Sequence, residues 1–94
     1  MTGHARISAD ILASYAVDAA REVEGVRLQG RRKGVRVTLD ETAVVVDLRV
    51  AVDWGVSIPD VARGVQRHVR EYLTRMADIE PPAVNVVVDG IGRP

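Results

Sequence analysis

The chain has 94 residues, a length that suits one domain, because a second core would be too small to be stable. Thirteen basic residues balance thirteen acidic ones, so no global field attracts nucleic acid or anionic lipid. The absence of cysteine excludes disulfides, thiolate zinc sites and a cysteine nucleophile, and the absence of Phe predicts a core of Val, Ile, Leu and Ala.

The segment 8–23 is predicted to form the first helix. Its apolar residues recur at helical spacing and fall on one face. Ser8 is placed to cap the N-terminus, and Gly25 is expected to end the helix. The predicted buried face consists of Leu12, Tyr15, Ala16, Ala19 and Val23.

Three segments with a period of two follow, at 26–29, 35–39 and 43–54. In the longest, alternate residues from Val44 to Val52 are all apolar, whereas those between them are mixed. Such a pattern is typical of a strand in a sheet that is covered on one side only. We expect these segments to form an antiparallel meander, with the loop Gly-Arg-Arg-Lys-Gly at 30–34 as a hairpin tip.

The second helix is predicted to begin at Ser57. Ser57 and Asp60 have the spacing of a capping box, Pro59 suits the first turn, and Gly55 permits a sharp turn from the preceding strand. Trp54, at that junction, is interpreted as covering the end of the core, with a partner anchor as the alternative. The predicted buried face of the helix consists of Ile58, Val61, Ala62, Val65, Val69, Tyr72, Leu73 and Met76.

A final strand is predicted in the segment Ala-Val-Asn-Val-Val-Val-Asp-Gly at 83–90. A strand, a helix and a strand in succession imply a crossover that makes the last strand parallel to a neighbour at the sheet edge. The predicted fold class is therefore α+β. It is a two-layer α/β sandwich with two helices packed on one face of a mixed, mostly antiparallel four-stranded sheet. We expect residues 1–94 to form one domain, with 1–6 and 91–94 as flexible tails.

No pattern in the chain predicts catalysis. Nucleophile-elbow, phosphate-loop and dinucleotide-binding motifs are absent, and His4 and His68 do not have ligand spacing. Asp47 and Asp53 share one strand face but lie far apart. We therefore expect no catalytic residue, no cofactor, no metal ligand and no enzymatic activity.

Two basic clusters are candidate binding sites. Arg31, Arg32 and Lys33 in the expected hairpin tip are candidate phosphate contacts, although exposed turns commonly carry such charges without a partner. On the second helix, Arg63, Gly64, Arg67 and His68 form a candidate protein-docking surface. The reason for this hypothesis is Gly64, which is expected to face outward and to weaken the helix by about 1 kcal/mol relative to Ala. The alternatives are a solvated helix face and a tolerated glycine.

Several segments resemble the alkaline shock protein family, the bacterial envelope stress response proteins. The resemblance is carried by Ala-Ala-Arg-Glu-Val-Glu-Gly-Val at 19–26, by the aromatic-Gly-x-x-Ile-Pro junction at 54–59, and by Val-Asn-Val-Val-Val-Asp-Gly at 84–90. It covers nearly the whole chain in the same order. It implies cytoplasmic, non-catalytic proteins tied to cell-envelope homeostasis, some held at the membrane through an integral membrane partner.

The sequence thus favours a non-catalytic protein-interaction module related to the cell envelope. We expect it to act through a protein partner, such as an integral membrane protein, or through self-association, without inserting into the membrane itself. Its expected location is the cytoplasm, with any membrane association made through that partner. The alternative is a small nucleic-acid-binding domain that uses the Arg-rich loop and helix.

Overall fold

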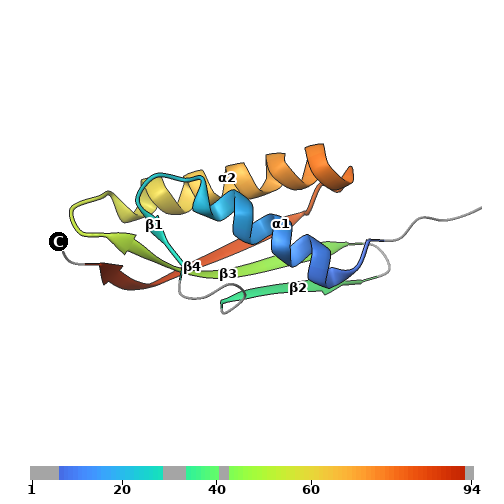
Figure 1. Ribbon diagram of the computed structural model, residues 1–94, viewed down its shortest axis with the longest axis horizontal. Coiled ribbons are helices and arrows are strands. Elements are labelled where there is room, and N and C mark those ends of the chain that lie inside the picture. Colours follow the sequence, from blue (N-terminus) through green and yellow to red (C-terminus); the bar gives the residue numbers. More distant parts are fainter. Residues whose placement is uncertain (1–6, 29–33, 41–42, 93–94) are drawn as a thin grey trace, which may run out of the picture.

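The computed structural model describes residues 7–28, 34–40 and 43–92. Two helices lie on the same side of a four-stranded sheet (Figure 1), so the predicted two-layer α+β fold is confirmed. The helices are α1 (Ala9–Arg21) and α2 (Ile58–Ala77), and the strands are β1 (Val26–Arg27), β2 (Val35–Leu39), β3 (Val44–Asp53) and β4 (Ala83–Gly92).

Strand β3 is the centre of the sheet. β4 runs parallel to it along one edge, from the pair Val45 and Ala83 to the pair Asp53 and Gly92, which confirms the predicted parallel last strand. β1 and β2 are both antiparallel to β3. They pair with different parts of β3, and since β4 occupies one edge of β3, they lie in line along the other.

The predicted meander is therefore wrong in one respect. β1 and β2 do not pair with each other, so the basic segment between them does not connect neighbouring strands. The physical reason is that β3 is long enough to serve both: Val26 of β1 lies opposite Val52, and Val35 of β2 lies opposite Leu48.

Side chains define where both helices begin. Ser8 Oγ accepts a hydrogen bond from the Ile11 amide at 3.2 Å, as predicted, and Ser57 Oγ accepts one from the Asp60 amide at 3.4 Å. The Asp60 carboxylate binds Arg63 at 2.6 Å. Helix α1 ends earlier than expected, at Arg21.

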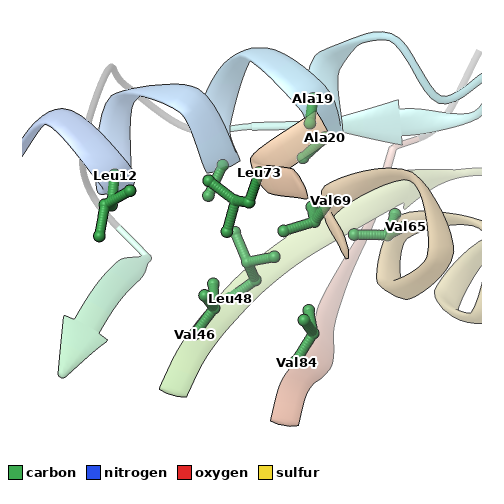
Figure 2. Close-up of a cluster of buried hydrophobic side chains, with 10 residues drawn as sticks. Leu12, Ala19, Ala20, Val46, Leu48, Val65, Val69, Leu73 and Val84 are labelled. Atoms are coloured by element: carbon green, nitrogen blue, oxygen red, sulfur yellow. The ribbon is translucent and has the colours of Figure 1, made fainter. Parts of the chain in front are cut away.

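The core lies between the helices and the sheet. Figure 2 shows Val65, Val69 and Leu73 of α2 directed toward side chains of the sheet, beside Leu12 of α1. Burial of this aliphatic surface is the main source of stability in so small a domain. Six residues on the predicted buried faces of the long strand and the second helix are at most 2% exposed, as expected: Val46, Leu48, Val50, Val65, Val69 and Leu73.

Both ends of α2 and the end of β4 differ from expectation. Ile58 and Met76, predicted to be buried, are 39% and 46% exposed, because they lie in the first and last turns of a helix that extends beyond the buried cluster. β4 continues to Gly92, so residues 91 and 92 belong to a strand and not to a flexible tail. Residues 1–6 and 93–94 lie outside the described residues.

Candidate functional site

Three large apolar side chains are exposed together where β3 and β4 end and α2 begins. Trp54 is 62% exposed, Ile91 50% and Ile58 39%. They line a hollow of about 310 Å³ together with residues 52, 53, 55 and 56. We call the side chains of Trp54, Ile58 and Ile91 the Trp54 surface. Figure 1 shows the turn from β3 into α2, which includes Trp54, at one end of the molecule.

The turn after β3 places Trp54 in this position. The Trp54 amide donates a hydrogen bond to the Gly92 carbonyl at 2.8 Å, which ties the turn to the end of β4. Gly55 follows with φ +91°, a conformation that glycine adopts without strain and that reverses the chain toward α2. The backbone therefore holds the indole beside Ile91 and the first turn of α2.

The interpretation that Trp54 covers the end of the core is wrong. Trp54 is the residue directly after β3, and its side chain lines the same hollow as Val52, Ile58 and Ile91. However, α2 begins four residues later, at Ile58, and leads away along the sheet. The indole therefore extends past the region that the helix covers.

Gly64 and His68 of the predicted docking surface face the segment that follows α1, and both are only partly exposed. A Cβ atom at Gly64 would lie 3.6 Å from Val23 Cγ1, an ordinary packing contact. His68 Nε2 lies 3.1 Å from Glu22 Oε1, and its ring is 6.3 Å from that of Tyr72. The outward orientation expected for Gly64 is thus wrong, because the segment after α1 lies against this side of α2.

Arg63 and Arg67 remain exposed on α2. Arg63 Nη2 binds Asp60 Oδ1 at 2.6 Å within the same helix. Both side chains of that pair are mostly exposed, so the pair contributes little to stability. Of the four residues predicted to form the docking surface, only these two are exposed in the structure.

The open face of the sheet carries charges that are matched within the chain. Arg27 Nε binds Asp53 Oδ1 at 2.5 Å, and Arg49 lies 3.7 Å from Asp89. Asn85 Nδ2 donates to an oxygen of Asp47 at 3.0 Å. A hollow of about 520 Å³ opens on this face, and Asp47 and Asn85, which line it, are hydrogen-bonded to each other.

Arg31, Arg32 and Lys33 lie outside the described residues, so their role as phosphate contacts stays a prediction. Among the residues that the structure does describe, no group of three or more His, Cys, Asp or Glu side chains is arranged to hold a metal ion. Neither of the two helices is long and apolar enough to cross a membrane.

Comparison with known proteins decides the family. Residues 27–93 match the model of the alkaline shock protein 23 family, described as having a cell envelope-related function. The chain belongs to this family. The match covers the sheet and α2, including the turn that presents Trp54, so the family resemblance seen in the sequence is confirmed.

Two similar proteins come from bacteria. The chain is 31% identical over 104 residues to YqhY of Bacillus subtilis (strain 168), covering 95% of this chain and 77% of the relative. It is 35% identical over 60 residues to Spy1535 of Streptococcus pyogenes serotype M6, covering 63% of this chain and 46% of the relative.

A solved structure, a variant of the MamM CTD, has the same fold. The TM-score is 0.61 at 17% identity, over 86% of this chain and 90% of that chain. At this identity the likeness concerns the fold alone. The likeness therefore indicates no function for this family member, and the Trp54 surface is the relevant feature.

Proposed function

We propose that this chain is a non-catalytic protein-interaction module that serves the cell envelope and docks a protein partner through the Trp54 surface. The observation that carries the proposal is an exposed tryptophan, at 62%, with two isoleucines beside one hollow. The cell envelope-related function of the family supports the same role. The partner is an integral membrane protein or another copy of the chain, and the module acts from the cytoplasm.

The energetics favour a covered Trp54. A tryptophan buries about 150–250 Å² when enclosed, and burial contributes about 25 cal/mol per Å². Covering the 62% of Trp54 that is exposed would therefore contribute roughly 2–4 kcal/mol to an association. Tryptophan is among the residues most enriched at positions that dominate binding energy. Exposed apolar groups that lie together commonly mark interaction sites.

Arg63 and Arg67 fit the proposal as charged residues near a docking surface. They lie on the same helix as Ile58, and both are exposed. Charged residues at the rim of an interface affect the association rate and specificity more than the affinity. No described residue favours the nucleic-acid alternative.

Replacing Trp54 with alanine tests the proposal. Because Trp54 is mostly exposed, Trp54→Ala is expected to change the free energy of unfolding by less than about 1 kcal/mol. Loss of the indole should nevertheless reduce recovery of the native partner by at least about ten-fold, the equivalent of 1.4 kcal/mol. The measurement is quantitative affinity purification of the tagged full chain from its native cells, with urea unfolding of the purified variant.

Leu39→Ala is the matched control. Leu39 is also a large apolar side chain, 48% exposed, but it ends β2 at the other end of β3 from Trp54. Its removal should leave partner recovery unchanged. Equal recovery by the wild type and Trp54→Ala would refute the proposed docking surface.

A further inference from the structure

The outer edge of β4 has no strand partner among the described residues. β4 is ten residues long and pairs only with β3. The opposite edge of the sheet differs, since it consists of a two-residue strand and a five-residue strand. Short, interrupted edges resist pairing with another chain, whereas long edges present a row of free backbone groups. The two edges of this sheet are thus unequally protected.

A hydrogen bond from α2 identifies which backbone groups of β4 point away from β3. Gln66 Nε2 donates to the Val84 carbonyl at 3.1 Å, so this carbonyl is directed away from β3 and is already occupied. Alternate residues of a strand direct their N–H and C=O groups to the same edge. Val86 and Val88 therefore present their backbone groups at the free edge. The register shift opposite Val50 and Ala51 ends the regular part of the strand after Val88.

The segment 85–89 is nearly symmetric about Val87. It reads Asn-Val-Val-Val-Asp, with an amide at one end and a carboxylate at the other. We propose that a second copy of this chain pairs antiparallel with β4 about a two-fold axis at Val87. Val86 of each copy then lies opposite Val88 of the other, and their outward groups form four backbone hydrogen bonds.

The side chains on the open face agree with this register. Val87 is 52% exposed, and on the two-fold axis it would be covered by Val87 of the second copy. Asn85 would lie opposite Asp89 of the second copy. Asn85 donates one of its two amide hydrogens to Asp47 at 3.0 Å, which leaves the other for that carboxylate. Among the described residues, Asp89 pairs with Arg49 at 3.7 Å, and its carboxylate retains acceptor capacity.

This pairing goes beyond the proposed function, because it uses the free edge of β4 at residues 85–88 instead of the Trp54 surface. It creates a closed two-fold dimer with one continuous sheet, and each copy still presents its own Trp54. The two proposals are therefore independent, and an experiment that refutes one does not refute the other. Trp54→Ala should leave the dimer that forms through β4 intact.

Sedimentation equilibrium of the full chain tests the pairing. The wild type should change from one copy to two as its concentration rises. Val87→Lys and Val87→Glu should each weaken dimerisation by at least about ten-fold, because like charges would meet at the axis. A one-to-one mixture of the two variants should restore the dimer. Val87→Thr, a β-branched replacement, should dimerise like the wild type.

Restoration in the mixture separates the interface from a folding defect, since a variant that fails to fold would not be rescued by its counterpart. The proposal is overturned if the wild type stays monomeric into the millimolar range. It is also overturned if the mixture sediments as the sum of its two components, or if Val87→Lys dimerises as well as the wild type.

Discussion

Leu73→Ala is expected to lower the free energy of unfolding by about 2–5 kcal/mol. Leu73 is fully buried in the cluster that joins α2 to α1 and the sheet, as Figure 2 shows. Removing its isobutyl group loses transfer free energy and leaves a cavity that a close-packed aliphatic core cannot fill completely. Urea unfolding followed by far-ultraviolet circular dichroism measures the change.

Met76→Ala provides the comparison on the same helix. Met76 is one turn further along and 46% exposed, so its truncation should cost less than about 1 kcal/mol. A loss below about half a kcal/mol for Leu73→Ala would mean that the assigned core face of α2 is wrong.

Gly34→Ala should destabilise the domain by about 2–4 kcal/mol, for two reasons that act together. Gly34 has φ +92°, where an L-residue is strained. An added Cβ would also lie 2.8 Å from the Arg49 carbonyl oxygen, which cannot move without disturbing the centre of β3. The Gly34 carbonyl accepts a hydrogen bond from the Arg49 amide, so the shift would weaken the start of β2.

Gly55→Ala separates these two causes. Gly55 has nearly the same φ, +91°, but nothing lies within 4 Å of its added Cβ. Its substitution should cost only the backbone strain, about 1–2 kcal/mol. Equal losses for the two variants in thermal and urea unfolding would show that the close approach to Arg49 contributes nothing.

The layers of the fold could be predicted because the hydrophobic periods were long and regular. Alternation along β3 assigned Val46, Leu48 and Val50 to the covered face, and the stripe on α2 assigned Val65 and Leu73, as the burial confirms. Each of these elements is long enough for its hydrophobic period to be recognised without ambiguity. Local pattern and tertiary packing agree there.

The arrangement of β1 could not be predicted for the opposite reason. A strand of two residues, Val26–Arg27, has no usable period, and the residues with which it pairs in β3 are 26 and 24 positions away in the chain. Proximity in sequence favoured pairing with β2. The length of β3, which accommodates both strands in line, decided otherwise.

In the candidate site too, the local sequence pattern was informative, whereas the contacts between distant elements could not be predicted. The sequence pattern located Trp54 at the junction between strand and helix, but did not indicate how little of its side chain α2 would cover. Likewise, the helical stripe left Gly64 outside the predicted buried face and did not reveal that Val23 packs there. Convergence of Ile91 with Trp54 depends on the parallel register of β4, which joins residues far apart in sequence.

Site-specific photo-crosslinking in living cells tests the docking role of the Trp54 surface most directly. A benzophenone amino acid replaces Trp54 in the full chain, and a control chain carries it at Asp18, an exposed position on α1. We expect a discrete protein adduct from position 54 that the control does not form. The absence of any discrete adduct at position 54, or the same adducts from both positions, would contradict a protein-docking role for this surface.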